Sequence, residues 1–192
     1  MERFRAELRD FIDSSFDGMG DALVFGEGAP GARVMLIGEA PGEQETRFGR
    51  PFVGKAGKNL DEFLTVAGLD RAQLYVTNVV KLRPTKLSKA GRTVNRPPTR
   101  DEIERFLPWL LREISLVAPA CIVTLGNVPL MALTDRHTVI GDVHGRLIHR
   151  DGRTLYPMYH PASVIYNPSL RPVYVEDIRR FGAWLRGEMP NA

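Results

Sequence analysis

Four short apolar runs, separated by stretches with helical periodicity, limit how this chain can fold. The runs are continuously apolar and do not alternate with polar residues, which is typical of parallel strands covered on both faces. They span residues 33–38, 74–79, 120–125 and 155–159. Regular alternation of strand and helix predicts right-handed crossovers between parallel strands. We therefore expect an α/β protein, a single three-layer α/β/α sandwich with a central four-stranded parallel sheet.

Helix-capping residues mark the helices expected between these runs. The segment 59–67 ends at Gly68, a residue suited to the C-cap position. Thr99 and Glu102 form a capping box that begins a helix ending near Val117. Further helices are expected over residues 2–15, just after residue 126, and over residues 173–186. With no internal repeat, the chain is expected to form a single domain over residues 1–192.

Composition excludes several classes of protein. The chain has 192 residues, of which 43% are hydrophobic and 26% are charged, as in ordinary globular proteins. No run approaches the roughly 18 uncharged apolar residues of a membrane helix, and the N-terminus shows no apolar signal segment. Cys121 is the sole cysteine, which excludes an internal disulfide and a multi-cysteine metal site. We expect a cytoplasmic protein with no metal and no membrane contact.

Positive charge is concentrated in one segment. Residues 81–100 contain seven basic side chains and no acidic one. Within it, residues 82–98 show no periodicity and are expected to form a long loop, which in a compact domain is usually functional or disordered. Such a local excess favours a polyanionic partner. The alternative is a mobile basic loop that contacts only solvent.

Three polar side chains stand where predicted strands end. Glu39 follows the first strand, Asn78 ends the second, and His160 follows the fourth. Because ligands of open parallel sheets bind at the carboxyl ends of the strands, we expect these groups, and the Gly126–Asn127 pair after the third strand, to meet at one edge. Each residue alone also has a structural interpretation, as a turn or a strand cap.

Four segments, in order, resemble the motifs of the uracil-DNA glycosylase superfamily, and most closely those of its family 4. They are GEAPGEQE at 38–45, GRPFVGKAG at 49–57, TNVVK at 77–81 and HPAS at 160–163. The resemblance implies a monofunctional enzyme that hydrolyses the N-glycosidic bond of deoxyuridine in DNA during base excision repair, leaving an abasic site. It implies uracil-containing DNA as the partner. We expect no organic cofactor and a monomer that needs no other protein.

The resemblance also assigns roles within the pocket. Phe52, which could otherwise be a core aromatic, would stack on the flipped uracil. Asn78 would select uracil through O4 and N3–H. His160 would donate to O2 as negative charge builds on the leaving base, and Glu39 would hold the attacking water. The backbone around three small residues would complete the pocket: Gly38, Ala40 and Gly42.

Two segments are candidates for binding DNA. Ser163, Val164 and Ile165 resemble the loop that enters the minor groove, and either Val164 or Ile165 would fill the gap left by the flipped base. The basic segment would follow the phosphate backbone. Its candidate DNA-binding residues are Lys81, Lys86, Lys89, Arg92, Asn95 and Arg96.

The sequence departs from family 4 at the cysteines that hold an iron–sulfur cluster. Leu82 and Phe106 stand at two of these positions, and Phe11 and Ser14 stand near the other two. None is a thiolate, so we expect no cluster, with apolar packing at Leu82 and Phe106 in its place.

An insertion at residues 85–95 is the second departure. The X-type branch of the superfamily has a basic loop here, ending in a histidine that attacks the sugar and stays covalently bound. Asn95 falls at that place, and a carboxamide is a poor nucleophile. We therefore expect turnover, or tight non-covalent holding of the product, but no crosslinking.

The third departure concerns thymine. Gly42 stands where another branch has a tyrosine that blocks the thymine methyl group. Exclusion of one methyl-sized group by an apolar pocket is limited to about 10–200-fold, so activity on thymine, hypoxanthine or xanthine stays open.

Two other functions remain open. One is a protein that binds uracil or abasic sites with little turnover, which a single-turnover cleavage assay would separate from an enzyme. The other is an α/β hydrolase that acts on a nucleoside or a small glycoside, which a steep salt dependence of DNA binding would exclude.

Overall fold

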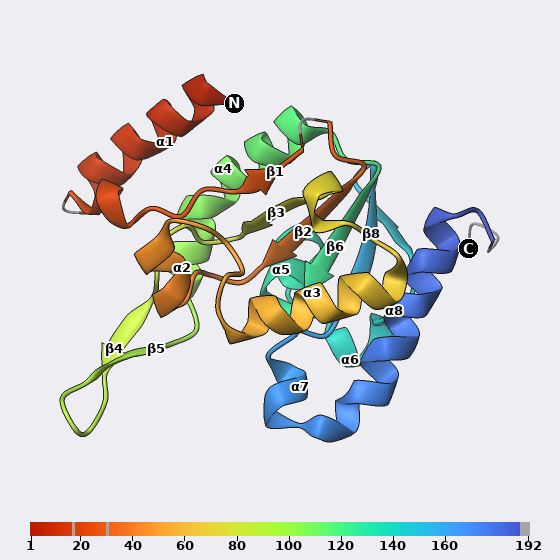
Figure 1. Cartoon of the computed structure of the whole chain (residues 1–192). Helices are drawn as coiled ribbons and strands as arrows, with labels where there is room; N and C mark the ends of the chain where they lie inside the picture. The colour runs from red at the N-terminus through yellow and green to blue at the C-terminus, as the bar shows by residue number, and fades with distance from the viewer. Residues whose placement is uncertain (17, 30, 189–192) are drawn as a thin grey trace.

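The computed structural model describes residues 1–16, 18–29 and 31–188. Its central sheet has six strands, and the four inner strands are parallel (Figure 1). In spatial order the strands are β1 (Glu27–Gly28), β3 (Tyr75–Asn78), β2 (Val34–Gly38), β6 (Cys121–Leu125), β8 (Arg153–Met158) and β7 (Ile148–Arg150). The fold is therefore α/β with a largely parallel sheet, as predicted.

The prediction of a four-stranded sheet is wrong, because two short antiparallel strands extend its edges. β1 pairs with β3, and β7 pairs with β8. These strands are two and three residues long and carry no apolar run. They join the sheet through backbone hydrogen bonds, so the hydrophobic pattern of the sequence does not reveal them.

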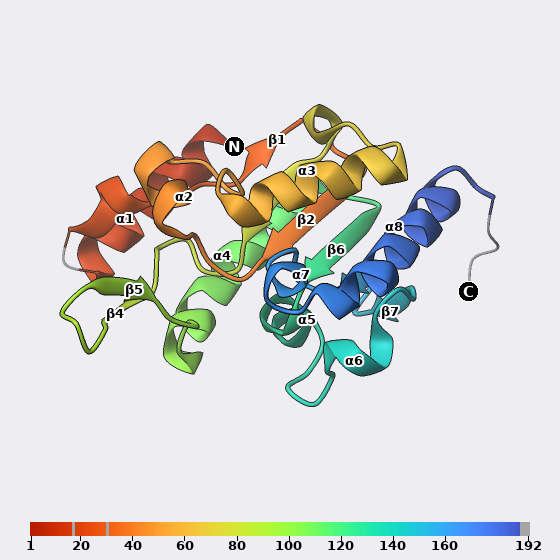
Figure 2. The same ribbon diagram turned by 60° about the horizontal axis from the view of Figure 1, so that its bottom comes forward.

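Successive residues of the inner strands face two apolar clusters, one on each side of the sheet. In β2, Met35 and Ile37 contribute to the first cluster, while Val34 and Leu36 contribute to the second. Helices α1 (Glu2–Ser15) and α4 (Arg100–Val117) pack in the first cluster. Helices α3 (Lys55–Ala67) and α8 (Arg171–Leu185) pack in the second, side by side in Figures 1 and 2. Burial on both faces explains why the strands are continuously apolar.

The predicted helix caps are confirmed. Gly68 adopts the left-handed conformation that ends α3. Before α4, the Thr99 hydroxyl accepts the Glu102 N–H (3.2 Å) and the Glu102 carboxylate accepts the Thr99 N–H (2.6 Å). Shorter helical elements complete the chain: α2 (Glu43–Phe48), α5 (Asn127–Leu133), α6 (Ile140–Val143), α7 (Ser163–Tyr166) and the 3-10 turns Met19–Ala22, Arg71–Gln73 and Pro168–Leu170.

The basic segment is not the structureless loop that the sequence predicts. It contains an antiparallel hairpin of β4 (Thr85–Leu87) and β5 (Thr93–Asn95), which is separate from the central sheet. The hairpin projects from the body of the protein in Figures 1 and 2. Its strands are exposed and largely polar, so they lack the alternating pattern on which strand prediction depends.

Within the described ranges, no helix is both long enough and apolar enough to cross a membrane.

Candidate active site

A cavity of about 680 Å³ opens at the carboxyl edge of the inner strands. This volume is within the usual range of small-molecule sites. Its inner wall comes from the ends of β2, β3 and β8 and from the segment before α3, and its outer wall comes from the hairpin and α7. Its lining includes Glu39, Ala40, Gly42, Glu45, Phe52, Lys55, Asn78, Asn95, Arg96, His160, Ile165 and Tyr166.

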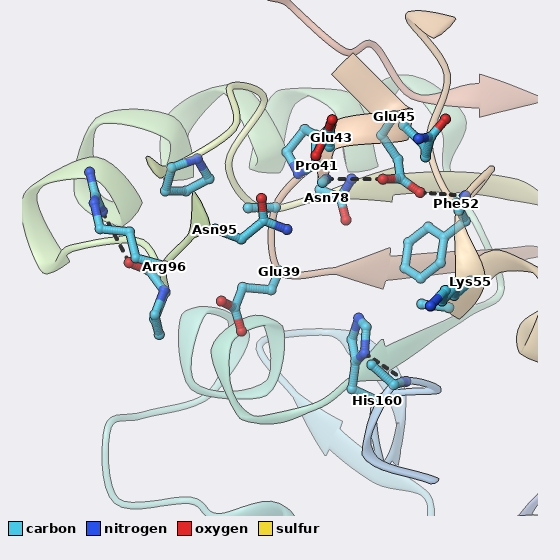
Figure 3. Close-up of a pocket in the computed structure, with 18 of the residues that line it drawn as sticks. Glu39, Pro41, Glu43, Glu45, Phe52, Lys55, Asn78, Asn95, Arg96 and His160 are labelled. Atoms are coloured by element: carbon cyan, nitrogen blue, oxygen red, sulfur yellow. Dashed lines mark hydrogen bonds between the residues drawn. The ribbon is translucent and has the colours of Figure 1, made fainter. Parts of the chain in front are cut away.

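The three polar side chains expected at the strand ends all line this cavity. Figure 3 shows Glu39, Asn78 and His160 around one common space, with the Phe52 ring at its side. The residues after β6 do not join them. Asn127 instead accepts the backbone N–H of Ile140 (2.8 Å).

Asn78 and Phe52 pack against the same glycine. Gly38 pairs with Asn78 across the parallel strands β2 and β3. A Cβ atom at Gly38 would lie 2.5 Å from Asn78 Oδ1 and 2.5 Å from Phe52 Cζ. Any larger residue would displace the carboxamide or the ring. Gly38 therefore supports the pocket from behind without lining it.

Phe52 occupies an unusual backbone conformation. Its φ of 53° is rare for a residue with a Cβ atom and costs conformational energy. Arg71 donates to the carbonyl oxygens of Pro51 (2.8 Å) and Phe52 (3.0 Å). Gly57 leaves room for the Phe52 carbonyl, which a Cβ atom would overlap. These contacts hold the ring at the cavity, with its centroid 5.9 Å from that of His160.

His160 is neutral and its tautomer is defined by a backbone contact. The Ala162 N–H donates to His160 Nδ1 (3.1 Å), so Nδ1 carries no hydrogen. Burial lowers the pKa of His160 to about 4, an effect that the charge of Glu45 partly opposes. At neutral pH the ring hydrogen is therefore on Nε2, which leaves His160 as a neutral hydrogen-bond donor.

Glu39 is a partly buried carboxylate. Burial raises the pKa of Glu39 above its usual value, because removal of water disfavours the charged form. A carboxylate in this environment suits a general base or an electrostatic partner for a cation.

Glu45 is a structural residue of the site that the sequence interpretation missed. Its carboxylate accepts the backbone N–H groups of Gly42 (3.1 Å), Val53 (3.0 Å) and Gly54 (2.8 Å). It thereby joins the segment after β2 to the segment before α3. Ala40 and Gly42 line the cavity, and the Gly42 N–H donates to Glu45. The sequence signal that could have indicated this role is the position of Glu45 as the third residue of α2, where a glutamate often accepts backbone N–H groups.

Asn95 brings the hairpin into the cavity. Arg83 Nε donates to Asn95 Oδ1 (2.7 Å), which fixes the orientation of the carboxamide. Nearer the tip, the side chains of Lys86, Lys89 and Arg92 are exposed. The hairpin thus places one amide in the pocket and three cations outside it.

Arg96 anchors the hairpin to α4. Its two terminal nitrogens lie 2.7 Å from the two carboxylate oxygens of Glu102, and its Nε donates to the Thr85 carbonyl (3.0 Å). The carboxylate neutralises Arg96, although the residue also borders the cavity.

Lys81 does not bind DNA from this position, and that prediction is wrong. Its side chain is 0% exposed, and its Nζ lies 2.5 Å from the Glu113 carboxylate on α4. The basic character of the segment concealed this burial, because the compensating acid is 32 residues away in sequence.

Helix α7 distinguishes between the two candidates for the minor-groove residue. Val164 is 6% exposed and packs in the second apolar cluster, so it cannot enter DNA without leaving the core. Ile165 is 43% exposed and lines the cavity. Ser163 is partly buried beside them. Tyr166, which the sequence interpretation missed, also lines the cavity and is 87% exposed.

Three of the four positions at which the resemblance places the family 4 cysteines carry apolar residues of the first cluster. Leu82 and Phe106 are buried in the first cluster, which confirms the prediction of apolar packing. Phe11 lies edge-on to Phe106, with ring centroids 6.5 Å apart, and Ser14 is exposed. These residues do not fit an iron–sulfur cluster, since none offers a thiolate. In the described part of the chain, no group of three or more His, Cys, Asp or Glu side chains could hold a metal ion.

The fold and the site together define an α/β protein with a largely parallel sheet and a pocket at the strand ends, which is bordered by an acid, an amide, an imidazole and a phenyl ring. The family model of the uracil DNA glycosylase superfamily matches residues 25–181, and the chain belongs to this superfamily.

Curated relatives cover most of the chain. It is 40% identical to the type-4 uracil-DNA glycosylase of Sulfurisphaera tokodaii over 81% of this chain and 71% of that protein. Identity to the type-4 uracil-DNA glycosylase of Pyrobaculum aerophilum is 39%, over 81% of this chain and 80% of the relative. A DNA polymerase of Bacillus phage SP01 is 34% identical over 86% of this chain but only 17% of its own length.

Proposed function

We propose that the protein is a monofunctional uracil-DNA glycosylase, which hydrolyses the N-glycosidic bond of deoxyuridine in DNA and leaves an abasic site. The observation that carries this proposal is the meeting of Glu39, Asn78 and His160, from three strand ends, in one cavity beside Phe52. Relatives named type-4 uracil-DNA glycosylases, at 37–40% identity, support the same reaction.

Recognition begins when uracil leaves the helix, at a cost of a few kcal/mol of unstacking. The extruded ring stacks on Phe52. The Asn78 amide donates to uracil O4 and accepts from N3–H, and cytosine mismatches it at both positions. Because Asn78 is held against Gly38, its carboxamide is oriented before the base arrives.

Bond cleavage uses the two remaining groups. As the bond between uracil N1 and C1′ breaks, its electron pair stays on uracil and positive charge develops on the sugar. The neutral His160 donates from Nε2 to uracil O2 and stabilises the leaving anion. The Glu39 carboxylate faces the cationic sugar, orients a water molecule toward C1′ and accepts the proton that the water loses.

The outer wall binds the DNA. The exposed Ile165 fills the gap left by the extruded base, and the Ser163 hydroxyl contacts a phosphate. The hairpin cations Lys86, Lys89 and Arg92 follow the phosphate backbone. In this proposal the chain acts as a single domain over residues 1–192, as a three-layer sandwich, a monomer, and without metal or cofactor.

One experiment tests the proposal and the substrate range together. Oligonucleotides with U:A, U:G, single-stranded U and T:G are incubated under single-turnover conditions, and abasic sites are cleaved with alkali. We expect excision from the uracil substrates, and the T:G substrate reports whether Gly42 relaxes the exclusion of thymine. Tight binding without excision would instead show that the protein binds uracil-containing DNA without cleaving the N-glycosidic bond.

Monofunctional chemistry has its own test, because Lys55 lines the cavity. A lysine that attacked the sugar would form a Schiff base, which borohydride converts to a stable adduct. We expect excision without a borohydride-dependent adduct. An adduct that Lys55→Arg abolishes would show a bifunctional enzyme.

The position of Asn95 in the cavity gives a test of crosslinking. We expect the wild-type protein to release DNA on a denaturing gel, and a stable protein–DNA band would contradict turnover. Asn95→His should trap a fraction of the DNA, because the imidazole would stand at the pocket. Absence of any adduct would count against this placement of the hairpin.

The assignment of Asn78 predicts a change of selectivity. In Asn78→Asp, the carboxyl group can accept from the exocyclic amine of cytosine and, when protonated, donate to cytosine N3, so excision of cytosine relative to uracil should rise. Comparison of the two substrates under single-turnover conditions measures this ratio, and an unchanged ratio would overturn the assignment.

A further inference from the structure

A buried ion pair lies next to Asn78 but outside the cavity lining. Lys81 is 0% exposed and Glu113 is 1% exposed, with 2.5 Å between Nζ and Oε2. Replacing a buried pair by side chains of similar volume is often neutral or stabilising, since both charges lose their hydration. Stability alone therefore does not explain why a charged pair occupies this position.

The pair belongs to a network in which every donor has an acceptor. The three N–H groups of Lys81 reach Glu113 Oε2, Thr77 Oγ1 (2.6 Å) and the Asn78 carbonyl oxygen (2.7 Å). The hydroxyl groups of Tyr75 (2.9 Å) and Thr77 (3.0 Å) donate to Glu113. Such a network fixes its members more rigidly than isolated contacts would.

The contact with Asn78 is at the point where the strand ends. Strand β3 ends at the pair of Gly38 with Asn78, and the turn that follows stays joined to the end of β2, because the Val79 N–H donates to the Gly38 carbonyl (2.9 Å) and the Val80 N–H donates to the Glu39 carbonyl (3.1 Å). At this turn the Asn78 carbonyl accepts the Lys81 ammonium, and Glu113 holds that ammonium from α4. The backbone of Asn78 is thus held by residues that lie outside the cavity lining.

We propose that Lys81 and Glu113 are positioning residues that set the orientation of Asn78 for base recognition. The inference rests on the proposed function, in which Asn78 contacts uracil. Neither residue lines the cavity, so neither acts on the substrate directly. Recognition groups need placement to within about 0.5 Å, and a displacement of about 1 Å can cost on the order of 100-fold in rate. A carbonyl that lost its partner would have to turn to find another, and the side chain would turn with it.

The test removes both charges and keeps the volume. Lys81→Met combined with Glu113→Gln should fold, because no buried charge is left unpaired. We expect its single-turnover rate of uracil excision at saturating enzyme to fall tenfold or more. Its Kd for uracil-containing DNA should stay within about twofold, since the outer wall is unchanged. Wild-type excision in parallel tests the proposed function separately.

A control is the partly buried pair on the other face of the sheet, in which the Asp177 side chain is 3% exposed and the His144 side chain is 27% exposed. Asp177 on α8 lies 2.7 Å from His144 Nδ1, and neither residue lines the cavity. Asp177→Asn should lower Tm while leaving the single-turnover rate of the folded protein unchanged. A wild-type rate in the folded double variant, or an equal loss of rate in Asp177→Asn, would overturn the positioning role.

A measurement on the wild-type chain covers the case in which the double variant does not fold. The Nζ resonance of Lys81 can be followed by NMR in protein labelled with ¹⁵N-lysine, because burial slows exchange of its hydrogens. Saturation with free uracil should shift this resonance, whereas cytosine should not. A resonance that does not respond to bound uracil would overturn the inference, and failure of uracil to bind at all would count against the proposed function instead.

Discussion

The two walls of the cavity differ in how their side chains are held. On the inner wall, Asn78 is 4% exposed and Phe52 is 5% exposed. Hydrogen bonds to or from the backbone hold Phe52 and His160, and the Asn78 side chain packs against Gly38. On the outer wall, Ile165 and Tyr166 are largely exposed. The inner wall is therefore arranged before any ligand arrives, whereas the exposed side chains of the outer wall would gain contacts when DNA binds. Substitutions on the inner wall should change chemistry, and substitutions on the outer wall should change affinity.

The largest expected effect is that of removing the imidazole. His160→Ala should lower the single-turnover rate by about 100–1,000-fold, the usual cost of losing one oxyanion donor. Its Kd for DNA should change little, because His160 acts on the leaving base. His149→Ala removes an exposed histidine outside the cavity lining and serves as the control. A large loss of affinity in His160→Ala would break the distinction between the walls.

The next effect concerns the hairpin cations. Replacing Lys86, Lys89 and Arg92 by alanine should weaken DNA binding at least tenfold at moderate salt. If all three contact phosphates, the slope of log affinity against log salt should fall by about 2.7, since each contact contributes roughly 0.9. The rate at saturating enzyme should not change.

The control for this variant removes equal charge elsewhere. Arg3, Arg179 and Arg180 are exposed and lie outside the cavity lining. Their replacement by alanine should leave the salt slope near the wild-type value. Equal effects of the two triple variants would show that net charge, and not the hairpin, determines affinity.

The same difference between the walls explains what the sequence could predict. Glu39, Asn78 and His160 were identifiable because each follows an apolar run, and the carboxyl ends of parallel strands share one edge. The edge strands and the hairpin lack an apolar pattern, so neither β1 nor β4 was foreseen. The hydrophobic pattern therefore predicted the three polar residues at the strand ends. It did not predict the short strands, which pair through backbone hydrogen bonds and have no apolar pattern.

The burial of polar residues is the second feature that the sequence did not predict. Lys81 and Arg96 belong to one basic segment, yet carboxylates of α4 hold both. Glu45 is one of two glutamates in the segment 43–45, and its role depends on Val53 and Gly54, which it meets only in the folded chain. Tertiary contacts decide which residues pair in this way, and the composition of a segment does not predict those contacts.

Tyr166 gives a smaller and more selective prediction. An exposed aromatic ring beside the cavity can stack on a base next to the extruded one, a contact worth about 1–3 kcal/mol. Tyr166→Ala should therefore weaken DNA binding about fivefold or more, whereas Tyr166→Phe keeps the ring and should retain affinity. Fluorescence of 2-aminopurine beside uracil would report the stacking. Equal affinity of both variants and the wild type for DNA would show that Tyr166 does not stack on a base.

The smallest expected effect is on stability, and it comes from Glu39. Burial raises the pKa of this carboxyl above its unfolded value, so folding disfavours the charged form. The stability contributed by a group of this kind is greatest at low pH, and it is lost as pH rises through the folded pKa. At pH 7.5, Glu39→Gln should therefore raise Tm while abolishing most of the activity.

The difference in Tm should shrink below about pH 4, where the wild-type carboxyl is also neutral. For the wild type, the rate should fall on acidification as Glu39 becomes protonated, at a pH above the usual range for a glutamate. The pKa of His160, about 4, keeps the imidazole largely neutral above about pH 5, so in that range Glu39 and not His160 sets the acid limb. Scanning fluorimetry and single-turnover rates from pH 4 to 8 check both statements. If Glu39→Gln were less stable than the wild type at pH 7.5, the Glu39 carboxylate would stabilise the fold. That result would contradict the view that the charged group lowers stability and serves the reaction.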